Sequence, residues 1–147
     1  MNAHPALSRA LLCLLLGVSS SAIAEVTVKD AWVRGTVPAQ KSTGAFLTIT
    51  SSEDAKLIGA SSPIAAMAEV HLSENKGGVM HMHAMEFLPL PAGKPVELKP
   101  GASHIMLMQL RKPVLAGEPL AIVLTIEDRN GKRSTVEVIA AVRPLGR

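Results

Sequence analysis

Hydrophobic and polar residues alternate over short stretches along most of this chain, and turn-forming residues interrupt the alternation at intervals of about ten residues. The apolar stretches are rich in Val, Ile, Thr and Leu, and Gly, Pro, Asn and Ser separate them. This pattern predicts strands with one buried face, and its regular spacing is typical of an all-β sandwich or barrel. The expected strands are residues 26–34, 43–51, 55–60, 64–73, 79–87, 94–98, 103–110, 119–127 and 133–142.

Two turn sequences predict hairpins between neighbouring strands. Asn130 and Gly131 lie between two apolar runs, and both residue types tolerate positive φ, which a tight hairpin requires. The adjacent Glu127 and Asp128 are therefore interpreted as turn residues rather than as an acid and base pair. The stretch SENKGGV predicts a second reversal of the chain, between the expected strands 64–73 and 79–87.

The second reversal predicts which side chains face each other. If the turn is centred after Lys76, His71 lies opposite Met82 and Met80 lies opposite Ser73. Side chains that face each other across an antiparallel pair have Cβ atoms about 4.5–5.5 Å apart. We therefore expect His71 and Met82 to be neighbours on one face of the hairpin.

The first 24 residues have the pattern of an export signal. Arg9 supplies a positive start, residues 10–18 are apolar, and Ala22 to Ala24 form a small-residue cleavage site. The apolar run is too short to span a bilayer. We expect cleavage near Ala24, a periplasmic location, no membrane insertion afterwards, and one mature domain of residues 25–147.

The composition of the mature domain removes several classes of function. The one cysteine, Cys13, lies in the predicted signal and follows Leu12, which does not match a lipoprotein attachment site. The mature domain therefore has no thiolate for a disulfide, a nucleophile or a metal. A formal charge near +2 with few aromatic residues argues against nucleic acid as a partner. Trp32 and Phe46 are expected to anchor the core.

Histidine and methionine are concentrated in the middle of the chain. All four histidines and all six methionines of the mature domain fall between residues 67 and 108. Methionines that only fill a core should be scattered through every apolar segment. The residues are His71, His81, His83, His104, Met67, Met80, Met82, Met85, Met106 and Met108.

Four of these residues form a candidate metal site. In SHIMLMQL, alternation places His104, Met106 and Met108 on one face of one strand. Two imidazoles and two thioethers, from His71, Met82, His104 and Met106, converge if this strand lies beside the predicted hairpin. Thioether sulfur favours Cu(I), and imidazole is compatible with copper in either oxidation state. Zinc sites normally use Cys, His or carboxylate ligands.

The spacing of these four residues resembles the copper-binding signature of the periplasmic copper chaperone PCu(A)C family. Ten residues separate His71 from Met82, twenty-one separate Met82 from His104, and one separates His104 from Met106. Other stretches are similar to the family, including VKDAWVR, GAFLTITS, LIGASSPIAAMAEVH and LPAGKPVELKPGASHIMLM. The resemblance covers essentially the whole mature chain.

The resemblance implies both a fold and a function. The fold is a cupredoxin-like Greek-key β-barrel or sandwich. The cargo is Cu(I), held by His71, Met82, His104 and Met106 in an exposed site. The partner is a copper-receiving protein, such as a cytochrome c oxidase subunit or another copper chaperone, and the implied role is delivery to the copper centres of that oxidase.

The remaining histidines and methionines leave alternatives open. Met80 is either an auxiliary thioether or a shield for the metal. His81 and His83 are expected on the strand face opposite Met82, either as solvated side chains or as a pair that binds Cu(II) at a second, weaker site. Met108 and Met67 are interpreted as packing residues.

Three other functions compete with the copper carrier. An electron-transfer cupredoxin is disfavoured, because a blue copper centre requires a cysteine thiolate. A copper resistance or storage protein uses the same ligand chemistry. A metal-independent exported β-sandwich would use the methionines as a contact patch for a partner. The sequence contains neither a recognisable nucleophile paired with a base nor a phosphate-binding loop, so it gives no indication of an enzyme.

Overall fold

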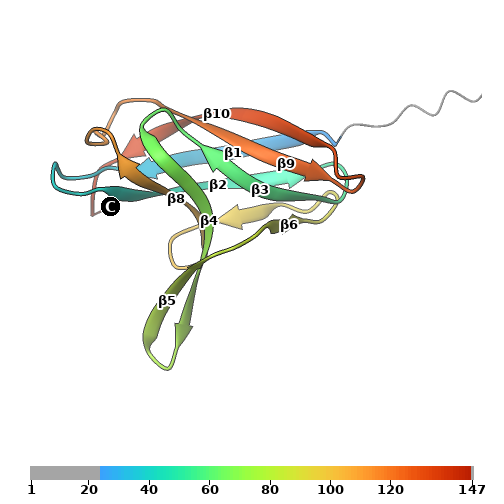
Figure 1. Ribbon diagram of the computed structural model, residues 1–147, viewed down its shortest axis with the longest axis horizontal. Helices are drawn as coiled ribbons and strands as arrows, with labels where there is room; N and C mark the ends of the chain where they lie inside the picture. Colours follow the sequence, from blue (N-terminus) through green and yellow to red (C-terminus); the bar gives the residue numbers. More distant parts are fainter. Residues whose placement is uncertain (1–23, 147) are drawn as a thin grey trace, which may run out of the picture.

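Ten strands form between Val26 and Arg143 in the computed structural model, which describes residues 24–146 (Figure 1). The predicted export signal up to residue 23 lies outside the described residues. Within residues 24–146, no helix has the length and apolar character needed to cross a membrane. The strands are β1 (Val26–Arg34), β2 (Ser42–Ser51), β3 (Ala55–Ser61), β4 (Ala65–Lys76), β5 (Val79–Ala84), β6 (Leu88–Leu90), β7 (Val96–Leu98), β8 (Ser103–Leu110), β9 (Leu120–Asp128) and β10 (Arg133–Arg143).

The strands follow one continuous path of hydrogen-bonded neighbours. Their order is β5-β4-β8-β2-β1-β10-β9-β3-β6, and β7 pairs with β2 beside this path. The β1–β10 pair is parallel, and the other pairs are antiparallel. The inward faces enclose one apolar core that includes Ile49, Leu57, Leu107, Ile122 and Leu124. The prediction of an all-β domain is confirmed.

All nine predicted strands are present, and the ends of most agree within one or two residues. The exceptions are the two hairpin strands: β4 continues to Lys76, three residues beyond the predicted end, and β5 ends at Ala84, with the separate strand β6 beginning at Leu88. The amide of Met85 donates a hydrogen bond to the carbonyl oxygen of Val70 at 2.8 Å, in register with the β4–β5 ladder and one step beyond its last pair, His71 and Ala84. The chain leaves the hairpin after this hydrogen bond and continues toward β3, with which β6 pairs.

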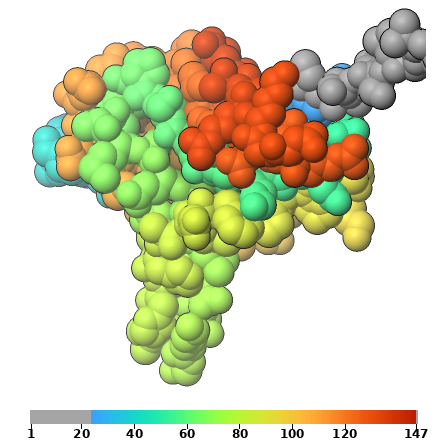
Figure 2. Space-filling model, turned by 45° about the vertical axis from the view of Figure 1, so that its right-hand side comes forward, coloured from blue at the N-terminus to red at the C-terminus, as the bar shows by residue number. Residues whose placement is uncertain are grey.

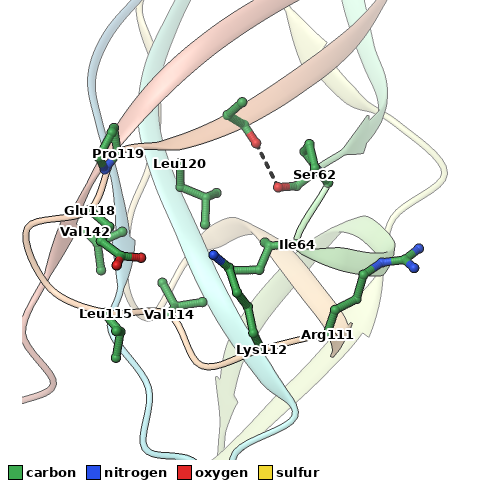
Figure 3. A pocket seen from close by; sticks show the side chains of 12 residues that line it. Ser62, Ile64, Arg111, Lys112, Val114, Leu115, Glu118, Pro119, Leu120 and Val142 are labelled. Carbon is green, nitrogen blue, oxygen red and sulfur yellow. Dashed lines mark hydrogen bonds between the residues drawn. The ribbon is translucent and has the colours of Figure 1, made fainter.

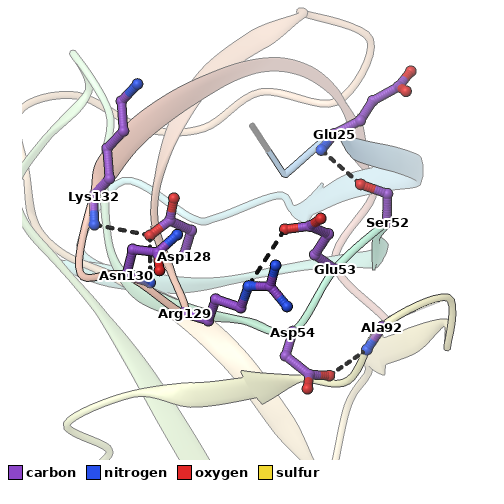
Figure 4. A network of polar contacts seen from close by, with 9 residues as sticks. All are labelled: Glu25, Ser52, Glu53, Asp54, Ala92, Asp128, Arg129, Asn130 and Lys132. Carbon is purple, nitrogen blue, oxygen red and sulfur yellow. Dashed lines mark hydrogen bonds and ion pairs between the residues drawn. The ribbon is translucent and has the colours of Figure 1, made fainter. Parts of the chain in front are cut away.

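The predicted turn between β9 and β10 is confirmed (Figure 4). Oδ1 of Asp128 accepts hydrogen bonds from the amides of Asn130 and Lys132, at 2.8 and 2.9 Å. Gly131 has a φ of 79°, which glycine adopts without steric penalty. Asp128 is thus a turn residue, as its position in the sequence predicts.

The β4–β5 hairpin projects from the body of the domain, as Figures 1 and 2 show. All six residues of β5 are exposed. The turn consists of Gly77 and Gly78, both at positive φ, between the paired residues Lys76 and Val79. The turn therefore lies one residue later than predicted, and the register differs by two residues.

The two-residue difference changes the partners of the predicted ligands across the hairpin. His71 lies opposite Ala84, and Met82 lies opposite Ser73, so the expected direct pair of His71 and Met82 was wrong. Met80 lies opposite Asn75 rather than Ser73. Because a shift of two residues preserves the face of each side chain, His71, Met82 and Met80 still share one face.

A β-bulge in β1 reverses the alternation of inward and outward residues. The register with β2 shifts between Lys29 and Trp32, and Asp30 has a φ of 54°. Val28 packs against the core before the bulge, and Val33 is fully buried in the core after it. Trp32 therefore faces outward, and the expectation that it anchors the core was wrong.

Candidate metal centre

Strand β8 lies directly beside the hairpin strand β4, the adjacency that the candidate site requires. His71 on β4 is the register partner of His104 on β8, and their ring centroids lie 5.8 Å apart in an edge-to-face arrangement. Met106 is the register partner of Glu69. With Met82 on β5, the four predicted ligands occupy one outer face of three neighbouring strands.

Each of the two histidines in the candidate site has one ring nitrogen held by a hydrogen bond. Nε2 of His71 donates to Oε2 of Glu69 at 2.9 Å, and Nδ1 of His104 donates to the carbonyl oxygen of Ala102 at 3.0 Å. Nδ1 of His71 is buried and has no hydrogen-bond partner. A carboxylate or carbonyl on one nitrogen is the usual way in which proteins orient a histidine whose other nitrogen binds metal.

Aromatic rings form a wall beside His104. The Phe46 centroid lies 6.2 Å from that of His104 and 4.4 Å from that of Trp32. A Cβ added at Gly44 would meet the Phe46 ring at 2.7 Å, so glycine provides the space in which the ring lies. Phe46 is only 4% exposed and is one of the buried hydrophobic residues, as predicted, although it lies outside the main core cluster and beside the candidate site.

Two arginines cover this aromatic wall. The guanidinium of Arg34 lies 5.6 Å from the centroid of Phe46, and that of Arg143 lies 4.4 Å from the centroid of Trp32. These distances are within the range of cation–π contacts. Together with the rings, they keep water away from His104, which is 4% exposed.

Burial lowers the pKa of His104 below its ordinary value of 6.5. The nearby His71 and Arg34 lower this pKa further, whereas the hydrogen bond to Ala102 raises it. The neutral imidazole that a metal requires is therefore favoured here.

The same pKa shift predicts how the stability of the metal-free protein depends on pH. The unfolded chain binds a proton at His104 at higher pH than the folded chain does, so this contribution is complete above about pH 6.5 and declines as the pH falls. We expect chemical unfolding to give a free energy that decreases from about pH 7.5 to about pH 5.5, less steeply in a His104→Gln variant. Equal slopes in wild type and His104→Gln would contradict this origin.

The thioethers lie at the open side of the site. Met82 is 52% exposed on the projecting hairpin, and Met106 is partly buried. Met82, His104 and Met106 line a cleft of about 120 Å³, whose other walls include Ser73 and Phe46. The site is therefore shallow: Met82 is exposed and His104 is buried, and His71 lies beside His104 without lining the cleft.

The two extra histidines lie on the other face of the hairpin, as the alternation predicts. His83 lies opposite Leu72, and His81 lies opposite Glu74. A hydrogen bond from Lys76 lowers the pKa of the Glu74 carboxyl, with smaller contributions from the charge of Lys76 and from the two histidines. Within residues 24–146, no three His, Cys, Asp or Glu side chains are placed together as a metal site.

A larger cleft of about 340 Å³ lies elsewhere on the domain (Figure 3). Its lining includes Ile64, Val114 and Leu120, with Arg111 and Lys112 at its side. None of its lining residues is a histidine or a methionine. The candidate metal centre is therefore separate from this cleft.

Three residues of the site face were not recognised from the sequence. Glu69, which orients His71, lies two residues before it and so shares its strand face. Met67 is 44% exposed, and Met108 is partly exposed; both lie outside the core cluster. The interpretation of these two methionines as core packing was wrong, although the alternation in SHIMLMQL had placed Met108 on the face of His104.

Comparison with solved structures defines the fold class. A copper-bound PCuAC domain from PmoF2 matches with a TM-score of 0.65 and 20% identity, over 84% of this chain and 96% of that domain. The solution structure of CuI-DR1885 from Deinococcus radiodurans matches with a TM-score of 0.61 and 27% identity, over 86% of this chain and 83% of that one. The domain thus has the cupredoxin-like β fold of PCuAC domains.

Sequence comparison defines the family. A family model described as "Putative lipoprotein LpqE-like" matches residues 26–140, and the chain belongs to this LpqE-like family. A lipoprotein described as putative, from Leifsonia xyli subsp. xyli, is 34% identical over 114 residues, which is 77% of this chain and 68% of that protein.

Proposed function

We propose that this protein is an exported copper chaperone that carries Cu(I) on His71, Met82, His104 and Met106. The observation that carries the proposal is the buried, unpartnered Nδ1 of His71 beside His104. A buried nitrogen without a hydrogen bond is costly unless another partner takes its lone pair. A metal ion held together with two thioethers supplies that partner.

The donor set selects the cargo. Two neutral imidazoles and two thioethers favour a soft ion such as Cu(I) over hard divalent ions. The copper-bound PmoF2 domain and the CuI form of DR1885 support this choice, because both have this fold. We propose the periplasm, or the equivalent space outside the inner membrane, as the location, which the lipoprotein description of the family supports.

The shallow site suits delivery to another protein. Met82 is the most exposed of the four residues and belongs to a hairpin strand without buried residues. An incoming ligand therefore reaches the ion from the side of Met82 while the two histidines still hold it. We propose that the recipient is a copper-receiving protein, such as a cytochrome c oxidase subunit or another copper chaperone.

The proposal includes a second, weaker site for Cu(II) on the other face of the hairpin. His81 and His83 are two residues apart on β5, so their imidazoles share that face. Both are exposed, and Glu74 lies directly opposite His81. Imidazole and carboxylate ligands suit Cu(II) better than thioether does.

Copper titration followed by X-ray absorption tests both sites. Under reducing conditions, we expect the first bound ion to have both sulfur and nitrogen ligands and no intense visible absorption. Under oxidising conditions, we expect Cu(II) with nitrogen ligands, which a His81→Ala, His83→Ala double variant loses. A first ion without sulfur ligands would contradict the main site, and unchanged Cu(II) binding by the double variant would contradict the second.

A further inference from the structure

Five of the six methionines in residues 24–146 lie on one outer face of β5, β4 and β8. Met85 is the exception, since it packs against the core. The proposed main site uses only Met82 and Met106. The other three are Met80 near the hairpin tip, and Met67 and Met108 on the opposite side of the histidines.

Met67, Met106 and Met108 are placed together by the register of β4 and β8. Met67 is the register partner of Met108, and directly opposed residues have Cβ atoms about 4.5–5.5 Å apart. Met106 lies two residues before Met108 on the same face, at a distance of about 7 Å along the strand. Each sulfur is two bonds beyond its Cβ on a flexible side chain, so the three thioethers can meet at one point.

Core packing does not account for Met67 and Met108. Met67 is 44% exposed, and neither residue belongs to the core cluster or packs against it. A large apolar side chain left on the surface gains little from burial. Met67 is instead exposed and Met108 is partly exposed, next to a site that already requires soft donors.

Gln109 orients one of these sulfurs. Its Nε2 donates a hydrogen bond to Sδ of Met67 at 3.5 Å. Gln109 has a φ of 53°, which residues other than glycine rarely adopt. Regular alternation would turn Gln109 toward the core, but here it is exposed on the side of Met67. An unfavourable backbone conformation thus holds an amide against a thioether, a geometry that points to a function for this sulfur.

The charge of the surrounding face also suits a cation. Glu69 lies on β4 between Met67 and His71, and it is the register partner of Met106. Its side chain is 40% exposed, and its Oε2 lies 2.9 Å from Nε2 of His71. Its carboxylate therefore provides negative charge between the main site and the three methionines.

We propose that Met67, Met106 and Met108 form a second site for a soft monovalent cation, made of thioethers alone. It shares Met106 with the four-residue site, and in this respect it rests on the proposed function. An ion moves between the two sites by exchanging the imidazoles and Met82 for Met67 and Met108, without leaving the Met106 sulfur. The face of β8 then provides a path for the ion, as well as a place where it is held.

Methionine methyl NMR during titration with Ag(I), a redox-inert substitute for Cu(I), tests this proposal. In the wild type, the first ion should shift the Met82 and Met106 methyl signals. Later additions should shift those of Met67 and Met108, with the shared Met106 sulfur bridging the two ions through its second lone pair. In a His71→Ala variant, the Met67 and Met108 signals should move from the first addition. A Met67→Leu, Met108→Leu double variant should keep the first step and lose the later one, and a Met85→Leu control should keep both.

The possible failures have different signatures. If the Met67 and Met108 methyl signals stay unchanged in both wild type and His71→Ala, the second site is wrong and the proposed function is unaffected. If the Met82 and Met106 signals do not respond to the first ion, the proposed main site is wrong. Retention of the later step by the double Leu variant would also overturn the second site.

Discussion

A Met106→Leu variant is expected to lose more than about 100-fold in Cu(I) affinity. Changing only the outer partners of a metal ligand typically costs about 10- to 100-fold, so loss of the ligand itself should cost more. Leucine keeps the volume of the side chain, and such exchanges usually cost less than about 1.5 kcal/mol of stability. Competition with a chromogenic Cu(I) chelator measures the affinity of wild type and variant under the same reducing conditions.

The matched control for this change is Met85→Leu. Met85 is also a methionine near the hairpin, but it packs against the core instead of facing the site. The control should compete for Cu(I) as strongly as the wild type does. If Met106→Leu also competed at the wild-type level, Met106 would not be a ligand, and the assignment of the site would be wrong.

A Leu107→Ala variant is expected to lose about 2–5 kcal/mol of unfolding free energy, the range measured for removing a large buried aliphatic side chain. Leu107 is completely buried in the core, although its neighbours Met106 and Met108 face the opposite side of the sheet. Denaturant unfolding of the metal-free protein measures the change. Metal must be absent, because a ligand that binds the folded state adds stability of its own.

Leu107→Ala should reduce stability and leave Cu(I) binding intact, whereas Met106→Leu should weaken Cu(I) binding and leave stability nearly unchanged. Folded Leu107→Ala protein should still bind Cu(I), since the change lies on the other face of β8. Met106→Leu should unfold close to the wild-type denaturant concentration. A loss of stability in Met106→Leu as large as that in Leu107→Ala would mean that Met106 belongs to the core and not to the site.

The sequence predicts the faces of the strands well, because alternation is local. The motif SHIMLMQL places His104 and Met106 on one face, and the structure agrees. The register of the β4–β5 hairpin was harder to predict from the sequence. Both glycines of the turn adopt positive φ, and the letters of SENKGGV do not show which two residues occupy the turn. The predicted ligands still share one face of the hairpin, because the register differs from the prediction by two residues and an even shift preserves the face of each side chain.

Non-local features explain the remaining differences. The adjacency of β4 and β8 joins segments more than thirty residues apart, and no local pattern reveals such pairing. The outward position of Trp32 depends on a bulge at Asp30, a residue whose side chain gives no clear signal for positive φ. Apolar composition alone therefore assigned Trp32 to the interior, as it did Met67.

Because the core and the proposed metal site lie on different faces of the sheet, folding of the domain can precede metal binding. None of the four proposed ligands belongs to the hydrophobic core cluster. Unlike a zinc finger, which stays unfolded until its ion arrives, this domain has enough buried apolar surface to fold first. We therefore expect the metal-free chain to fold without copper, so that metal binding follows folding.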